Sequence, residues 1–294
     1  MDYKFLVIGL LGKHGDPRVA DTLVHLLTFL RRRQLRVLVD EGSAYAVRDM
    51  GDVELGDRAA IGRECDICIV VGGDGTLLDA ARSLVDSGIP LLGINQGRLG
   101  FLVDVSPAEM TQRLEEILCG RFQEEQRCLL SASVVRDGKL VAQSDALNDV
   151  VVHKHDVARI IEMQTYLDGD FINTYRADGL IISTPTGSTA YNLSCGGPIV
   201  HPALDVLVLL PICPHTLTNR PIVVDASGEI EILVTGWHSD YTPVICDGQV
   251  VLSMEPGDRL LIRAKPSKLQ LLQPAGHDYF EVLRAKLGWG VHPK

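Results

Sequence analysis

The first 95 residues alternate short, unbroken apolar runs with stretches whose apolar positions recur at helical spacing. The apolar runs predict strands over 5–10, 35–39, 67–71 and 90–94, and the spacing predicts helices over 16–33 and 77–85. Asp16-Pro17 is a typical helix start, because it places a capping side chain before a proline at the first helical position. Repeated strand, glycine turn and helix predict a parallel sheet wrapped by helices, with ligands at the carboxyl ends of its strands.

The pattern changes after about residue 127. Short β-rich runs follow at 129–135, 146–152, 160–167, 180–183, 229–234, 243–246 and 259–263, separated by turns such as Asp137-Gly138, Asp168-Gly169 and Asp247-Gly248. This spacing is typical of a β-sandwich. Helices are predicted near 188–194 and over 278–287. The last predicted helix is like the helices of the first half of the chain, so we expect the chain to return to the first domain at its end. The expected domains are an α/β domain of 1–126 plus 269–294 and a sandwich-like domain of 127–268.

Composition and charge narrow the class of protein. The 294 residues are 46% hydrophobic, too apolar for a disordered chain, and the net charge of −10 disfavours a nucleic-acid partner. We expect no membrane partner, because neither a run of about 18 apolar residues nor a signal peptide is evident. Seven scattered cysteines predict reduced thiols and a cytoplasmic location. Cys65 and Cys68 lack the second pair that a zinc site needs, so we interpret them as structural.

The sequence Gly72-Gly73-Asp74-Gly75-Thr76 joins the strand at 67–71 to the following helix. Glycines let backbone N–H groups approach an anion, and the helix N-terminus adds a positive dipole, so Gly72, Gly73, Gly75 and Thr76 are candidates for binding phosphate. Asp74 is then a candidate general base or metal partner for phosphoryl transfer. The alternative is an ordinary turn in which Asp74 caps the helix. The pattern is neither a Walker A motif nor a dinucleotide fingerprint.

Two shorter features carry open alternatives. The loop from Gly93 to Leu102 holds three glycines after a strand, and Phe101 with Leu102 could offer an apolar wall to a base, or the loop could be structural. Asn148-Asp149 is a polar pair inside an apolar run, which costs burial energy unless it has partners. Ribose hydroxyls would suit an amide beside a carboxylate, and a turn at a strand edge is the alternative.

The longest candidate segment runs from Arg176 to Pro198. In it, an apolar strand is followed by a loop that is rich in hydroxyl side chains and glycines. Thr186 or Ser188 is expected to cap the next helix and leave N–H groups for a ligand. Tyr191, about one turn into that helix, could stack on a ring. The histidines in this half of the chain are interpreted as structural, namely His153, His155, His201 and His215.

These motifs, in order and spacing, resemble those of the NAD kinases, and most of all the bacterial enzymes of the Gram-negative type. The Gly-Gly-Asp-Gly sequence alone is shared with diacylglycerol, sphingosine and phosphofructo-kinases, whereas Thr184-Pro185-Thr186-Gly187-Ser188-Thr189-Ala190-Tyr191 is specific. The ending Lys286-Leu287-Gly288-Trp289-Gly290 is similar as well, so the resemblance covers almost the whole chain.

The resemblance implies a cytoplasmic transferase of NADP biosynthesis that moves the ATP γ-phosphoryl group to the 2′-hydroxyl of the adenosine ribose of NAD. It implies homodimers or homotetramers, Asp74 as the base, and a divalent metal, Mg²⁺, held mainly through the ATP phosphates with Asp74 as the candidate protein ligand. The implied NAD contacts are Asp74, Gly75, Leu78, Phe101, Asn148, Asp149, Arg159, Arg176, Asp178, Thr186, Thr189, Ala190, Tyr191, Asn192, Leu193, Ser194 and Gln249.

Arg176 resembles the subgroup that prefers NAD to NADH. Cys195 departs from the family pattern, in which alanine is common, and puts in doubt whether the site is inert to oxidants. Two other functions remain as hypotheses: a lipid or sugar kinase sharing the Gly-Gly-Asp-Gly sequence, and a protein that senses NAD without catalysis.

Overall fold

The computed structural model describes residues 3–97, 100–103, 105–155, 160–235 and 241–290. The chain divides into two compact units, the first formed by Met1–Gln126 with Leu269–Lys294 and the second by Arg127–Lys268. Within the described ranges, no helix is long and apolar enough to cross a bilayer. Each unit is described by itself below.

The first unit is built on a seven-stranded sheet in the order β3-β2-β1-β4-β5-β19-β6. Its strands are β1 (Val7–Gly12), β2 (Arg36–Asp40), β3 (Glu54–Gly56), β4 (Ile67–Gly72), β5 (Leu91–Asn95), β6 (Phe122–Arg127) and β19 (Leu269–Pro274). The pairs β1–β2, β1–β4, β2–β3, β4–β5 and β5–β19 are parallel. β4 and β5 are buried at every position, as strands of a covered parallel sheet are.

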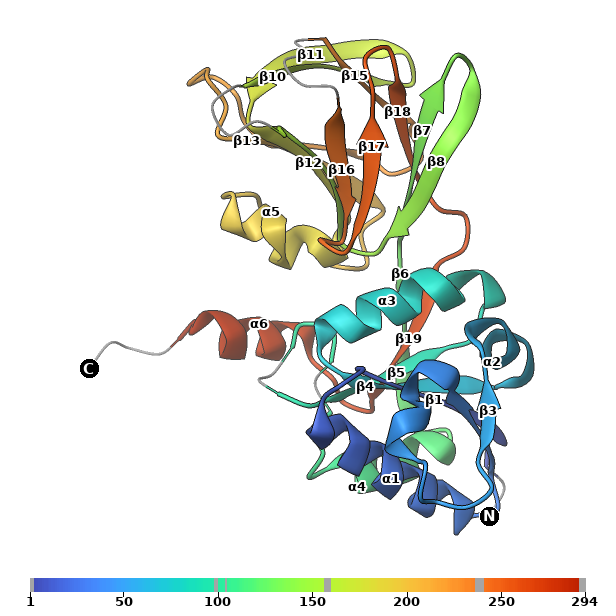
Figure 1. The fold of residues 1–294 in the computed structure, drawn as a ribbon. Coiled ribbons are helices and arrows are strands. Elements are labelled where there is room, and N and C mark those ends of the chain that lie inside the picture. The colour runs from blue at the N-terminus through green and yellow to red at the C-terminus, as the bar shows by residue number, and fades with distance from the viewer. Residues whose placement is uncertain (1–2, 98–99, 104, 156–159, 236–240, 291–294) are drawn as a thin grey trace. The chain divides into compact units, whose positions relative to one another are not determined.

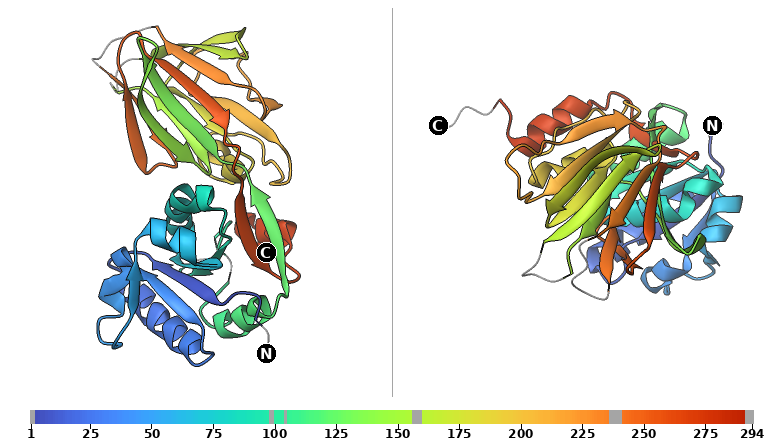
Figure 2. Two further views of the ribbon diagram at one scale, coloured as in Figure 1. Left: turned by 90° about the vertical axis from the view of Figure 1, so that its right-hand side faces the viewer. Right: turned by 90° about the horizontal axis from the view of Figure 1, so that it is seen from above.

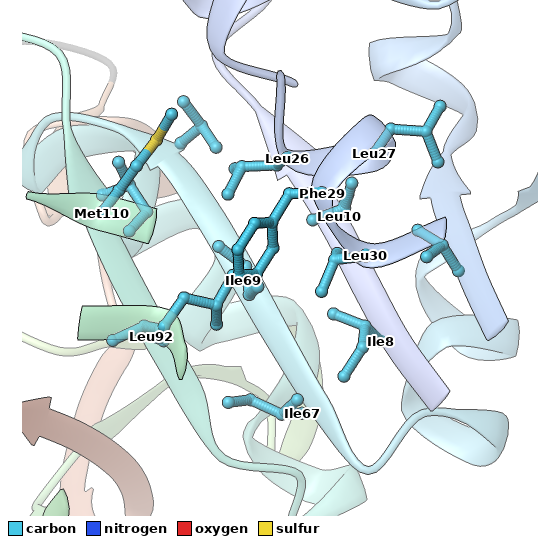
Figure 3. Packing of buried hydrophobic residues seen from close by; sticks show 14 of the residues in the cluster. Ile8, Leu10, Leu26, Leu27, Phe29, Leu30, Ile67, Ile69, Leu92 and Met110 are labelled. Carbon is cyan, nitrogen blue, oxygen red and sulfur yellow. The ribbon is translucent and has the colours of Figure 1, made fainter. Parts of the chain in front are cut away.

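Helices cover both faces of this sheet (Figure 1). They are α1 (Pro17–Arg31), α2 (Arg58–Glu64), α3 (Asp74–Leu84) and α4 (Met110–Leu118), with 3₁₀ turns η1 (Glu41–Ala46) and η2 (Val85–Ser87). The last helix, α6 (Tyr279–Leu287), extends to the side of the sheet (Figure 1). Figure 3 shows Leu26, Phe29 and Leu30 of α1 packed on Ile8 and Ile69 of the sheet. The predicted parallel sheet wrapped by helices is confirmed.

The second unit is an antiparallel sandwich of two six-stranded sheets, which Figures 1 and 2 show as separate layers. One sheet orders β11 (Asp170–Ala177), β10 (Ile161–Leu167), β15 (Ile230–Val234), β18 (Arg259–Ala264), β7 (Leu130–Arg136) and β8 (Lys139–Ala146). The other orders β14 (Ile222–Asp225), β13 (Val206–Ile212), β12 (Gly179–Ser183), β9 (Asp149–His153), β16 (Thr242–Cys246) and β17 (Val250–Met254).

Alternation of side chains explains the sandwich. The strand β10 alternates buried and partly exposed residues, and its buried Ile161 and Met163 meet Val150 and Val152 of β9 in one core between the sheets. The sandwich expected from the sequence is therefore confirmed. The Asp-Gly turns also form as expected, because Asp137, Asp168 and Asp247 have φ angles of 50°, 51° and 53° and each precedes a glycine of positive φ.

One predicted helix differs in the structure. Residues 188–194 contain the end of a 3₁₀ turn, η3 (Thr186–Thr189), and a single α-helical turn, α5 (Tyr191–Ser194). The N-cap of α5 is Ala190, which has no side-chain hydrogen bond to the helix, so the expected capping by Thr186 or Ser188 is wrong. The Ser188 hydroxyl instead donates to the Pro185 carbonyl, and the Thr186 hydroxyl accepts from Arg127.

Candidate active site

The glycine loop of the first unit lies where β4 passes into α3. A Cβ atom on Gly72 would overlap the side chain of Thr76, so only glycine fits at the end of this strand. Gly73 is the N-cap of α3 and Asp74 is its first residue, which means that Asp74 is not the capping residue. Gly73 and Gly75 are exposed. The loop therefore presents backbone to solvent at the carboxyl edge of the parallel sheet, where ligands bind in such folds.

The Asp74 carboxylate is fixed by the loop that follows β5. It accepts N–H groups from Phe101 at 2.9 Å on Oδ2 and from Leu102 and Val103 at 3.2 Å each on Oδ1. Gly100 makes this approach possible, because a Cβ there would overlap Oδ1 of Asp74. An ionised carboxylate offers about four lone-pair sites. The half-buried Asp74 thus keeps capacity to accept a further proton donor while its orientation is set by three bonds.

Phe101 links this loop to the C-terminal helix. Its ring is half-buried, and the Nζ atom of Lys286 on α6 lies 5.0 Å from the ring centroid. Leu78, a predicted NAD contact, is buried on α3. Arg98 and Leu99, which belong to the same loop motif, lie outside the described residues.

A pocket of about 460 Å³ opens within the second unit. It brings together four residues that the resemblance implied as NAD contacts, Asn148, Asp149, Ala190 and Tyr191. The remaining lining residues were not predicted as contacts, and these are Val151, His153, Ile245, Asp247 and Gly248. The pocket therefore joins the end of β9, the start of α5 and the turn after β16, and its size is within the usual range for small-ligand sites.

Asp149 is the most perturbed acid of this pocket. Its side chain is only 4% exposed, and burial, followed by the charge of Asp247, raises the pKa of Asp149 to about 7. Protonated and ionised forms are therefore both populated near neutral pH. A protonated carboxyl can donate a hydrogen bond as well as accept one, which a fully ionised acid cannot do.

Asp247 holds the Asn148-Asp149 corner in place. Its carboxylate accepts the N–H groups of Leu147 at 3.0 Å, Asn148 at 2.7 Å and Asp149 at 3.3 Å. The sequence predicted Asp247-Gly248 only as a turn. No local pattern revealed that a turn residue would accept N–H groups from residues about 100 positions earlier.

The hydroxyl-rich loop is built by its own polar side chains. The Thr184 hydroxyl donates to the Leu147 carbonyl at 2.6 Å, and the Ser188 hydroxyl donates to the Pro185 carbonyl at 2.6 Å. The Asn192 amide donates to carbonyls of Ser188 and Pro198 at 3.0 Å. A Cβ on Gly187 would overlap the Asn148 carbonyl. These bonds fix the loop against the Asn148-Asp149 corner.

The other implied contacts lie outside the pocket lining. Arg176 is exposed and pairs with Glu162 at 3.0 Å, and Asp178 pairs with Lys154 at 2.7 Å. Thr186 is buried, with its hydroxyl 3.5 Å from a guanidinium nitrogen of Arg127. The rest are partly buried Thr189 and Leu193, buried Asn192, and exposed Ser194 and Gln249. Arg159 lies outside the described residues.

Cys195 lies beside the pocket and hydrogen-bonds with Tyr191, whose side chain is 40% exposed. Burial raises the pKa of the Cys195 thiol, with the bond to Tyr191 acting in the opposite direction. Since the thiolate is the reactive form, this environment disfavours oxidation of Cys195 at neutral pH. Within the described ranges, no cluster of three or more His, Cys, Asp or Glu side chains is arranged to hold a metal ion.

Two family profiles match most of the chain. The ATP-NAD kinase N-terminal domain matches residues 8–122, and the ATP-NAD kinase C-terminal domain matches residues 147–273. The chain belongs to the ATP-NAD kinase family. Among curated relatives in this family, the NAD kinase of Chromohalobacter salexigens is 50% identical over 285 residues, covering 97% of each chain. That of Hahella chejuensis is 47% identical over 286 residues, covering 97% of this chain and 96% of its own.

Solved structures agree with this family membership. An NAD kinase from Archaeoglobus fulgidus in complex with ATP is similar at a TM-score of 0.74 and 25% identity, covering 96% of this chain and 98% of its own. A yeast NADH kinase complexed with NADH shares the fold at a TM-score of 0.89 and 24% identity, covering 98% and 89%. The fold class expected from the sequence is therefore that of solved members of the ATP-NAD kinase family.

Proposed function

We propose that this chain is an NAD kinase, which transfers the γ-phosphoryl group of ATP to the 2′-hydroxyl of the adenosine ribose of NAD and releases NADP and ADP. Membership of the ATP-NAD kinase family supports the reaction. The observation that carries the mechanism is the carboxylate of Asp74, fixed by three N–H groups at the exposed edge of the parallel sheet.

Asp74 is proposed as the general base. A ribose hydroxyl is a weak nucleophile, and a positioned carboxylate that accepts its proton as the phosphoryl group arrives contributes about 10²–10⁴-fold in rate. The N–H groups of Phe101, Leu102 and Val103 hold the carboxylate in one orientation before substrate binds. Preorganisation of this kind removes the cost of orienting the base during the reaction.

The phosphate charge is assigned to the backbone and to the metal. The exposed backbone at Gly73 and Gly75 lies at the N-terminus of α3, where the helix dipole favours the donor phosphates. Asp74 is the one carboxylate of the glycine loop that could hold a Mg²⁺ ion carried by ATP. Such a cation would neutralise charge on the transferred group.

The pocket of the second unit is proposed as the NAD subsite. Asn148 and Asp149 supply an amide and a carboxyl for ribose hydroxyls or the carboxamide, and exposed Tyr191 supplies an aromatic face for a ring. The other contacts implied by the resemblance stay proposals for the same ligand. We also propose that the enzyme works in the cytoplasm as a homo-oligomer, and the seven free thiols fit a reducing compartment.

A coupled assay tests the proposed reaction. Purified protein is given NAD, ATP and Mg²⁺, and NADP is detected with an NADP-specific dehydrogenase. Parallel reactions with labelled ATP contain diacylglycerol or fructose 6-phosphate in place of NAD. We expect NADP and ADP in equal amounts and no labelled lipid or sugar. Saturable NAD binding without ADP release would instead identify a non-catalytic binding protein.

A further inference from the structure

The loop that follows β1 lies beside the glycine loop. β1 and β4 are parallel neighbours, with Gly12 paired to Val71, so the segments that follow them leave the sheet at the same edge. The N–H of Lys13 donates to the Val71 carbonyl at 3.0 Å, one residue before Gly72. Lys13 and His14 are thus held next to the start of the proposed phosphate site.

This loop is braced by the η1 segment beneath it. The hydroxyl of Ser43, which is fully buried, accepts the N–H of Gly12 at 2.9 Å. The Tyr45 hydroxyl donates to the Lys13 carbonyl at 2.7 Å, and the rings of His14 and Tyr45 meet edge to face at 5.1 Å. An exposed loop held by this many side-chain contacts is preorganised, as binding loops need to be.

Lys13 offers a positive charge at this edge. Its side chain is exposed, and among the described residues no carboxylate lies within 4.0 Å of its ammonium group, although its charge contributes to lowering the pKa of Asp16. The nearby carboxylate of Asp16 is taken by Arg18, whose Nε and Nη2 atoms lie 3.2 Å and 3.0 Å from its two oxygens. Because the whole chain carries a net charge of −10, an anionic substrate must be attracted by local cations of this kind.

We propose that Lys13 binds the phosphate chain of the phosphoryl donor and holds it beside the glycine loop. The proposal rests on the proposed kinase function and adds a donor-side residue to it. An ammonium group recognises phosphate as a point charge and does not read the base. Nucleoside triphosphates and inorganic polyphosphate share this chemistry, so either donor would use Lys13.

The test compares Lys13→Gln with Arg32→Gln, which removes the same charge from an exposed residue at the opposite end of α1. Initial rates are measured against ATP at saturating NAD and against NAD at saturating ATP. We expect Lys13→Gln to raise the KM for ATP about tenfold, equivalent to about 1.4 kcal/mol, and to leave the KM for NAD unchanged. Lys13→Arg should retain a KM for ATP close to that of the unmodified enzyme, and Arg32→Gln should change neither constant.

Reactions with other phosphoryl donors, together with the control variant, test whether Lys13 acts on the phosphate chain. GTP should show the same factor as ATP, and so should inorganic polyphosphate if the unmodified enzyme uses it. An unchanged KM for ATP in Lys13→Gln, or an equal rise in Arg32→Gln, would overturn the role of Lys13. If the unmodified protein makes no NADP, the proposed function fails instead. In that case titration calorimetry with MgATP still tests Lys13. The proposed role of Lys13 predicts a higher Kd for MgATP in Lys13→Gln than in the unmodified protein.

Discussion

Asp74 in the first unit and Asp247 in the second each accept N–H groups from three consecutive residues of a distant loop. Their surroundings differ. Asp74 is half-buried at the edge of a parallel sheet, whereas Asp247 is 9% exposed under the Asn148-Asp149 corner. The same hydrogen-bond arrangement therefore leaves the Asp74 carboxylate partly accessible to solvent and buries the Asp247 carboxylate, which positions neighbouring residues.

The difference separates chemistry from positioning. A half-buried carboxylate with unused acceptor capacity can take a proton from a ligand. A buried carboxylate that satisfies backbone N–H groups mainly stabilises the chain around it, because unpaired buried N–H groups are costly. Substitutions at the two sites should accordingly change different measured quantities.

The largest effect is expected from Asp74→Asn. The amide keeps the size of the side chain but cannot act as a base, so kcat should fall by about 10²–10⁴-fold while the Kd for NAD changes little. Single-turnover kinetics and NAD titration measure the two quantities. A variant that keeps near-normal kcat would remove Asp74 from the mechanism.

Asp247→Ala should act on stability and on NAD binding. The change leaves the N–H groups of Leu147, Asn148 and Asp149 without their acceptor, which should lower the free energy of unfolding by about 3 kcal/mol and raise the KM for NAD. Urea denaturation and steady-state kinetics report both effects. Loss of kcat with unchanged stability would show that Asp247 acts in the chemistry and would break the contrast with Asp74.

The pH dependence of Asp149 distinguishes the second unit further. Because the folded pKa of about 7 lies above the unfolded value, the folded state binds the proton more tightly, and stability from this group falls as pH rises from about 4 to 7. Asp149→Asn should remove that loss. The variant should therefore gain about 4 kcal/mol of unfolding free energy relative to the unmodified protein between pH 4 and pH 8. A difference in unfolding free energy that stays constant with pH would contradict the raised pKa.

The smallest effect tests how closely Asp74 is held. Gly100→Ala places a methyl group against the Asp74 carboxylate and should reduce kcat about tenfold, equivalent to about 1.4 kcal/mol. Gly97→Ala, in the same loop, meets only the Asn95 amide oxygen at 4.0 Å and should leave kcat unchanged. Equal kcat values for the two variants would mean that the position of the carboxylate is not critical.

Much of the fold could be predicted from local patterns. The unbroken apolar run at 67–71 and the alternating run at 160–167 carry the periods of a covered parallel strand and a sandwich strand, and both strands form. The helix expected near 188–194 forms as a 3₁₀ turn followed by one α-helical turn, and only its capping was mispredicted. The Ser188 hydroxyl looks like a cap but donates to the Pro185 carbonyl and accepts the N–H of Val200, a contact that no local pattern indicates.

The candidate site was predictable where it rests on motifs and not where it rests on distant contacts. The Gly-Gly-Asp-Gly sequence identified Asp74, but its binding by Phe101–Val103 depends on the packing of two loops. Likewise, Asp247 was interpreted only as a turn residue. The N–H groups that its carboxylate accepts belong to residues about 100 positions earlier in the chain. Long-range pairing of this kind leaves no period or spacing in the sequence.

The strand β19 has a consequence for synthesis of the protein. It lies between β5 and β6 in the sheet of the first unit, yet it begins only at Leu269. The ribosome therefore completes all of Arg127–Lys268 before the strand that belongs between β5 and β6 is available. Domains generally fold as units during translation. The second unit can therefore fold first, while the edge of β5 stays unpaired until β19 has been synthesised.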